Sequence, residues 1–334
     1  MNRYGILKDI LNKKRLFKVV CGAGNEDPEE IRKLTKAFTL AKTGMIDISA
    51  NVEIVEACKK GIAQALEIAP KMGISLSCRP FINVSVGLRG DPHVRKARIS
   101  GELCVECGQC TEQCEQSAIN DSFSVIEYRC IGCGKCAEVC EADAITFYHK
   151  KLEFEKILPE VLNAGAENLE LHAIIEDDKA VIDDWRLLSD LVPGNFVSMC
   201  MDQTLLSNTH LSNRIKEAYA VSGERTIIQA DGDPMSGGSD DFNTTLQAVS
   251  TADIVQKSGV PVKILASGGT NSRTKELADL CGVNIHGVSI GTFARKLIRR
   301  EIETEEFDQD TSILAKAVEK ASRLVNWSIG EFDK

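Results

Sequence analysis

Eight of the thirteen cysteines form two copies of one spacing pattern, which is the strongest chemical signal in the chain. Each copy places cysteines three, six and ten residues after its first, at Cys104, Cys107, Cys110 and Cys114, and at Cys130, Cys133, Cys136 and Cys140. Bacterial ferredoxins with two clusters use this spacing: three close thiolates bind one cubane, and the fourth binds the other. The sequence therefore predicts two [4Fe–4S] clusters.

The same rule divides the eight cysteines into two crossed ligand sets. The first cysteine set is Cys104, Cys107, Cys110 and Cys140, and the second cysteine set is Cys130, Cys133, Cys136 and Cys114. Structural zinc is a weaker interpretation, because it usually needs two pairs of ligands with a longer gap between the pairs. A disulfide framework also fits poorly, because this long chain shows no secretory signal. The other five cysteines (Cys21, Cys58, Cys78, Cys200 and Cys281) lack metal spacing and are expected to be small buried residues.

Composition narrows the class of protein. A hydrophobic share of 43% and a charged share of 27% are typical of a globular protein, and reduced cysteines favour the cytoplasm. A net charge of −9 argues against nucleic acid as a partner. No apolar run approaches the roughly 20 residues of a transmembrane segment. The first residues, 1–17, carry an apolar helical stripe that predicts a short helix closing the bottom of a domain, with binding to a membrane surface as the alternative.

Outside the cysteine region, short apolar strands alternate with helical patterns. Eight strands are expected, at 16–21, 45–49, 81–86, 169–175, 196–201, 226–231, 262–267 and 286–291. Each is followed by a helix once the cysteine region is set aside, which predicts a (β/α)8 barrel of the TIM type. A doubly wound open sheet is the competing arrangement.

The cysteine region falls between the third strand and its helix. We therefore expect a barrel in two pieces, at 1–97 and 149–334, with a ferredoxin-like two-cluster insert at 98–148. In such barrels this loop lies on the C-terminal face, where active sites are found. Both clusters should then lie over the mouth of the barrel.

Two glycine-containing turns at the ends of the seventh and eighth strands could bind phosphate. Their backbone N–H groups lie at helix N-termini, the usual phosphate position of these barrels. The candidates are Gly268, Gly269, Gly291 and Thr292, for a phosphorylated substrate or FMN. Glycines that merely make tight turns are the plain alternative. The loop at 231–241 could be a lid or an ordinary surface loop.

Polar residues near strand ends are the other candidates for chemistry at the mouth. They are Asp47, Ser49, Asn83, Ser85, Glu170, His172, Asp202, Gln229 and Asp231. Glu170 and His172 are two residues apart and should face the same side of their strand, where they could relay a proton. No further set of residues identifies a catalytic group.

The chain resembles the light-dependent period protein family (LdpA) of cyanobacteria over nearly its whole length. The resemblance is carried by the cysteine motifs and by "FKVVCGAGN", "MIDISAN", "ADGDPMSG", "ILASGGTNSRT" and "GVSIGTFARKL". The barrel halves are also similar to the plastid Ycf23 family, which lacks clusters. The resemblance implies an iron–sulfur protein that senses cellular redox state and, in a host with a clock, tunes the circadian period. It implies the eight cysteines as cluster ligands and no catalytic residues.

Three functions are compatible with these patterns. The first is a redox sensor that exchanges electrons with a redox partner protein or a quinone-linked pool and acts on a regulatory protein partner. The second is an oxidoreductase whose clusters pass electrons to a flavin or a phosphorylated substrate at the barrel mouth. The third, a simple electron carrier, leaves the barrel without a role. The redox sensor is the preferred hypothesis.

Overall fold

The computed structural model of the chain describes residues 2–22, 24–87, 95–149, 152–203, 205–232 and 238–331. Eight parallel strands close into a barrel in the order β1-β10-β9-β8-β7-β6-β3-β2. Their bounds are β1 Leu16–Val20, β2 Met45–Ser49, β3 Phe81–Gly87, β6 Asn168–His172, β7 Val197–Met201, β8 Thr226–Asp231, β9 Lys263–Ser267 and β10 Gly287–Ile290. The predicted (β/α)8 barrel is therefore confirmed, and closure of the sheet excludes the doubly wound alternative.

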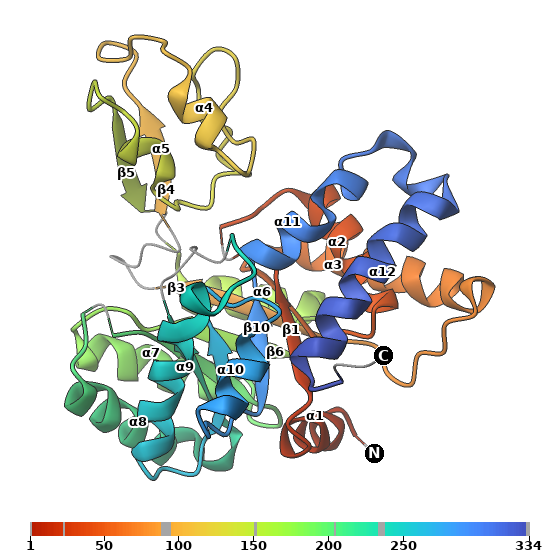
Figure 1. The fold of residues 1–334 in the computed structure, drawn as a ribbon. Coiled ribbons are helices and arrows are strands. Elements are labelled where there is room, and N and C mark those ends of the chain that lie inside the picture. Colours follow the sequence, from red (N-terminus) through yellow and green to blue (C-terminus); the bar gives the residue numbers. More distant parts are fainter. Residues whose placement is uncertain are drawn as a thin grey trace.

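Helices surround the barrel (Figure 1). Their bounds are α2 Pro28–Leu40, α3 Val52–Ile68, α6 Phe154–Ala164, α7 Asp178–Leu191, α8 Asn208–Ser222, α9 Phe242–Lys257, α10 Thr274–Leu280, α11 Thr292–Ile302 and α12 Thr311–Ser328. A short polar side chain caps the start of α2, α3, α7, α8, α9 and α12. Asp27 accepts hydrogen bonds from the backbone N–H groups of Glu29 and Glu30, and Pro28 occupies the first turn. Such caps satisfy N–H groups that have no acceptor within the helix.

The barrel interior changes from apolar to polar between its two ends. The bottom layer is apolar: Leu16, Met45, Phe81, Phe196, Ile227 and Leu265 pack together there. Helix α1 (Arg3–Asn12) closes this end with Leu7 and Leu11, as the sequence predicts. It lies at the end of the barrel opposite the cysteine region (Figure 1). Because alternate residues of a strand face the same side, the positions two and four residues further along face the barrel interior above this layer. Many of these are polar.

The cysteine region forms a small module between β3 and α6, as predicted. Its two-stranded antiparallel sheet pairs β4 (Arg95–Ile99) with β5 (Ile145–His149). Two short helices, α4 (Gln109–Gln113) and α5 (Lys135–Glu138), each contain the third cysteine of one copy of the repeat, Cys110 and Cys136. Residues 95–97 belong to this sheet. The division of the chain at 97 and 148 stays a prediction.

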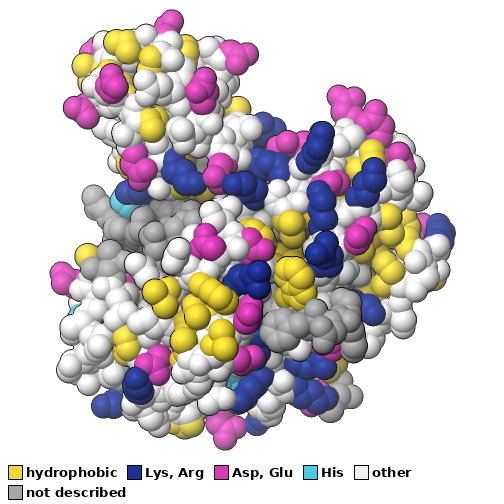
Figure 2. Space-filling model, viewed as in Figure 1, with side chains coloured by type: hydrophobic (Ala, Val, Ile, Leu, Met, Phe, Trp, Pro, Cys, Tyr) yellow, Lys and Arg dark blue, Asp and Glu magenta, His cyan; other side chains and the backbone are white. Residues whose placement is uncertain are grey.

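Charged residues join the module to the barrel. Buried Lys96 of β4 donates from Nζ to the carbonyl oxygens of Gly24 at 2.6 Å, Glu127 at 2.9 Å and Cys130 at 2.8 Å. Arg129 Nε lies 3.2 Å from Asp27 Oδ2. Lys and Arg side chains gather where the module meets the barrel, whereas Asp and Glu side chains are spread over the outer face of the module (Figure 2). The junction thus ties the module to the loop after β1.

Candidate functional site

The module contains two cavities, and each is lined by one crossed set of four cysteines. The cavity around the second cysteine set has about 380 Å³ of space free of atoms, and its wall includes Cys114 from the first copy of the repeat. The cavity around the first cysteine set has about 510 Å³ and includes Cys140 from the second copy. The fold therefore brings each fourth cysteine to the other copy's three, as the spacing predicts.

The walls of these cavities suit iron–sulfur clusters chemically. They are mainly apolar, and all thirteen cysteines are free thiols. Burial, and then the neighbouring cysteines, raises the pKa of Cys136 to about 12. Such a thiol becomes a thiolate only beside a strong positive charge, which cluster iron supplies.

Backbone N–H groups already point at three of the sulfurs. Ala97 N lies 3.4 Å from Cys130 Sγ, Ala118 N lies 3.2 Å from Cys114 Sγ, and Ala144 N lies 3.4 Å from Cys140 Sγ. Hydrogen bonds of this kind tune cluster potentials. Across the described ranges, no three His, Cys, Asp or Glu side chains converge closely enough for a single metal ion. The sulfurs instead surround a space, which favours a cluster over zinc.

The two cavities face in different directions. At the first cysteine set, Cys107 is exposed and the neighbouring Val105 is 70% exposed. At the second set, Cys130 and Cys136 are buried, and Ile131 is only 8% exposed. Ile131 lines both this cavity and a larger one in the barrel mouth. Ile131 therefore forms part of the wall between the second cysteine set and the barrel.

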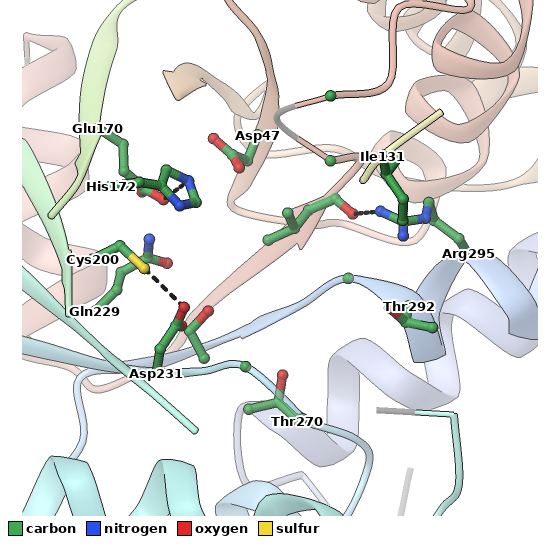
Figure 3. Close-up of a pocket in the computed structure, with 17 residues that line it drawn as sticks. Asp47, Ile131, Glu170, His172, Cys200, Gln229, Asp231, Thr270, Thr292 and Arg295 are labelled. Atoms are coloured by element: carbon green, nitrogen blue, oxygen red, sulfur yellow. Dashed lines mark hydrogen bonds and ion pairs between the residues drawn. The ribbon is translucent and has the colours of Figure 1, made fainter. Parts of the chain in front are cut away.

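The barrel-mouth cavity has about 690 Å³ of space free of atoms, at the C-terminal ends of the strands (Figure 3). Its lining residues are Val20, Gly22, Gly24, Asp47, Ile131, Glu170, His172, Cys200, Gln229, Asp231, Ser267, Gly268, Gly269, Thr270, Gly291, Thr292 and Arg295. Five predicted polar positions are among them: Asp47, Glu170, His172, Gln229 and Asp231. Four others are buried but do not line it: Ser49, Asn83, Ser85 and Asp202.

A buried charge network supports the floor of this cavity. Lys18 Nζ lies 2.5 Å from Glu170 Oε2 and 3.8 Å from Asp47 Oδ1. Asn83 Nδ2 and Ser85 Oγ each donate to Asp47 Oδ1 at 2.5 Å. All five side chains are 2% exposed or less. Sequence reasoning missed Lys18; the signal was a lysine inside an otherwise apolar strand.

The network shifts the pKa values of its two carboxyl groups in opposite directions. Burial, opposed in part by Lys18, raises the pKa of Asp47 to about 6. Burial alone would also raise the pKa of Glu170, but the charge of Lys18 and the hydrogen bond from it lower that pKa. At neutral pH Glu170 is thus an ion-paired carboxylate, while Asp47 can exchange a proton near pH 6. Such paired carboxyl groups can serve acid–base chemistry.

A thiol also faces the cavity. Cys200 Sγ donates to Asp231 Oδ2 at 2.8 Å. Its neighbour across the strand pair is His172, whose Nε2 lies 3.7 Å from Glu170 Oε1. Glu170 and His172 therefore lie close together on the same face of their strand, as expected. Cys200, Cys21 and Cys58 are buried, as expected, but the sequence did not place Cys200 in the mouth. The same expectation was wrong for Cys281, which is exposed, and for Cys78, which is only half-buried.

The predicted phosphate positions all line the cavity, and their surroundings differ. A Cβ built on Gly268 would lie 3.2 Å from the carboxyl carbon of Asp231, so that turn lies against a carboxyl group. Gly291 and Thr292 lie instead at the start of α11, with Arg295 one turn further. Residues 233–237 of the 231–241 loop lie outside the described residues.

Comparison with known proteins supports the same interpretation. Residues 160–327, half of the chain, match the family model of the Light dependent period A C-terminal domain. Residues 123–146 match a 4Fe-4S binding domain, and residues 1–69 match a family of proteins of unknown function, DUF561. Light dependent period A from Synechococcus elongatus is 27% identical over 324 residues, covering 92% of this chain and 90% of that protein.

Among solved structures, similarity is weak. The YdjI aldolase from Escherichia coli K12 has a TM-score of 0.48 at 11% identity, covering 98% of this chain and 94% of that one. A putative fructose-1,6-biphosphate aldolase from Coccidioides immitis has a TM-score of 0.48 at 10% identity, covering 98% and 95%. Neither likeness bears on the chemistry of this chain.

Fold and site together define an iron–sulfur protein built on a (β/α)8 barrel. Within that class, the chain belongs to the family of the Light dependent period A C-terminal domain, which confirms the resemblance seen in the sequence. No helix in the described part of the chain is both long and apolar enough to cross a membrane.

Proposed function

We propose that this protein is a redox regulator of the LdpA type that holds two [4Fe–4S] clusters. The observation that carries the proposal is the crossing of the cysteine sets: Cys114 and Cys140 each complete the other copy's cavity. Clusters of this kind accept and release single electrons when bound. The residues around them provide thiolates, N–H donors and apolar walls.

The exposed side of the module supports electron exchange with a partner. Cys107 and Val105 leave the first cysteine set near the surface, where a redox partner protein or a quinone-linked pool can approach. The buried side faces the barrel, so a change of charge there acts on the junction through Lys96 and Ile131. In a host with a circadian clock, this signal would tune the period, in keeping with the name of the Synechococcus relative.

A potentiometric titration under anaerobic conditions, followed by electron paramagnetic resonance, tests this proposal. A redox regulator should show clusters that are reduced and reoxidised reversibly over several cycles. Irreversible loss of the signals in the first cycle, or no redox change within the range of cellular carriers, would contradict it.

One observation favours a second function, an oxidoreductase acting at the barrel mouth. Ile131 lines both the cavity of the second cysteine set and the barrel-mouth cavity, which holds a carboxyl pair, a histidine and a thiol. In this function the clusters would exchange electrons with FMN or a phosphorylated substrate in that cavity. Acid precipitation of the anaerobically purified protein decides for flavin, because acid destroys the clusters and releases bound FMN into the supernatant, where its own absorption and fluorescence are measured.

A further inference from the structure

The barrel-mouth cavity has two chemically different sides (Figure 3). Glu170, His172, Cys200 and Asp231 lie on one side, and Thr292 and Arg295 lie on the other. The first side has carboxyl groups, and Lys18 beneath it balances one negative charge. The second side has a guanidinium at the positive end of a helix. A ligand that fills the cavity must therefore present different groups to its two sides.

Arg295 is a buried cation with no carboxylate in direct contact among the described residues; Glu30 and Glu115 act on its charge from beyond ion-pair distance. Its residue is 3% exposed, and it forms no salt bridge within the described ranges. Its Nη1 donates to Val20 O at 3.1 Å, while its Nε is buried and has no hydrogen-bond partner among the described residues. Burying a charge without a partner is strongly unfavourable, because the charge loses its hydration and gains no ion pair in return. Such a group is stabilised by an anion that enters the cavity.

The start of α11 adds further donors at the same place. Gly291 caps this eleven-residue helix without a side-chain hydrogen bond. The first N–H groups of a helix have no acceptor within it, and the helix dipole is positive there. A cation four residues into a helix is unfavourable for the same reason. Arg295 at this position is therefore explained by binding an anion rather than by stabilising the helix.

The turn after β1 keeps Arg295 accessible from the cavity. Gly22 has a φ of +106°, and a Cβ built on it would lie 3.1 Å from Arg295 Nη1 and 3.7 Å from Ile131 Cγ2. Neighbouring Asn25 is fully buried, and its Nδ2 also lacks a partner among the described residues. A larger residue at 22 would press on the guanidinium. The conformation here requires glycine on both steric and backbone grounds.

We propose that the barrel mouth binds a small phosphate monoester, with its phosphate held by Arg295 and the N-terminus of α11. Phosphate oxygens match both a guanidinium and several helix N–H groups, so phosphate suits this side better than a carboxylate does. The hydroxyl or carbonyl end of the ligand would face Glu170, His172 and Asp231. This inference rests on the second proposed function and names the ligand class of its site.

Isothermal titration calorimetry on the anaerobic, cluster-loaded full chain tests the proposal with four probes: glycerol 3-phosphate, inorganic phosphate, acetate and glycerol. We expect saturable binding of the two phosphates and none of glycerol. Arg295→Gln should weaken phosphate binding at least tenfold, since one charged hydrogen-bonding group contributes about 1.5–3 kcal/mol. Arg300→Gln removes the same charge from an exposed position on the same helix and should leave binding unchanged.

A second variant covers the case in which Arg295→Gln fails to fold. Thr292→Glu places an acid in the first turn of α11, where it favours the helix but repels an anion. It should also abolish phosphate binding, with cluster content unchanged. The proposal is overturned if Arg295→Gln and Thr292→Glu bind phosphate as well as the parent chain does. It is also overturned if the parent chain binds no phosphate or prefers acetate. Cluster content and spectra are measured in the same samples, so failure of the redox proposal is seen separately.

Discussion

At the residue scale, the eight cysteines carry most of the chemistry, and their crossing distinguishes one linked two-cluster site from two independent motifs. Cys114 and Cys140 lie in one copy of the repeat but line the cavity of the other. Sequence spacing was sufficient here because ligand geometry fixes the order of the thiolates. The charged residues under the barrel mouth could not be assigned this way, because Lys18 and Arg295 acquire meaning only through their neighbours.

The crossing predicts which cluster each substitution removes. Cys114→Ser should abolish the cluster of the second cysteine set and spare the other, although Cys114 belongs to the first copy of the repeat. Cys140→Ser should have the reciprocal effect. Electron paramagnetic resonance of the reduced protein distinguishes the two clusters. Cys281→Ser, at an exposed cysteine far along the chain, serves as the control and should leave both signals intact. Loss of the same signal in Cys114→Ser and in Cys140→Ser would contradict the crossed assignment.

At the scale of elements, the eight strands follow closely from the pattern of short apolar runs. β2 and β8 match their predicted ranges, and the others differ by one to three residues at an end. The helices that follow them were equally visible, since Asp27 and Pro28 mark the start of α2. The module sheet was missed, because β4 (Arg95–Ile99) is charged at three of its five positions and lacks the apolar run of a buried strand. Its pairing with β5 depends on the cysteine loops between them.

One pH effect belongs to the bottom of the barrel, where β9 and β10 meet. Burial, and then the charges of Lys263 and Lys14, lowers the pKa of His286 from 6.5 to about 4. Its Nδ1 accepts a hydrogen bond from the N–H of Ile264 at 3.0 Å, which requires the neutral ring. Below pH 6.5 the unfolded chain binds a proton that the folded chain does not. The stability contribution of neutral His286 is therefore complete above about pH 6.5 and is lost as the pH falls towards 4.

Denaturant unfolding of the parent chain and His286→Gln between pH 7.5 and pH 5 measures this effect. The parent chain should lose about 1 kcal/mol more than the variant on acidification, allowing for the partial exposure of the ring. Only the pH-dependent part of the difference is predicted, because the variant changes the hydrogen bond at every pH. Parallel pH profiles for the two chains would show that His286 does not titrate as described.

At the scale of the whole molecule, the position of the module determines what the clusters can influence. The prediction that it leaves the barrel after the third strand was sufficient to place it over the mouth. The contacts that hold it there were not predictable, because Lys96 binds backbone carbonyl groups from segments far apart in the chain. The shared wall at Ile131 likewise arises only from the packing of module on barrel.

Lys96 should therefore tune the second cluster as well as hold the module. Lys96→Met removes a buried positive charge from the carbonyl of Cys130 and leaves its three acceptors without that donor. We expect a loss of about 3 kcal/mol in stability and a lower reduction potential for the cluster of the second set, because reduction adds negative charge. Redox titration beside Arg98→Met, which removes an exposed cation from the same strand, checks this. Equal potentials in the two variants would contradict the role given to Lys96.

The central claim is that this barrel protein carries two [4Fe–4S] clusters in its crossed cysteine sets. Iron and acid-labile sulfide counted in the anaerobically purified full chain test it most directly. We expect about eight iron and eight sulfide per chain, from two cubanes. A count of about four or fewer, in protein whose thiols are all reduced, would contradict it.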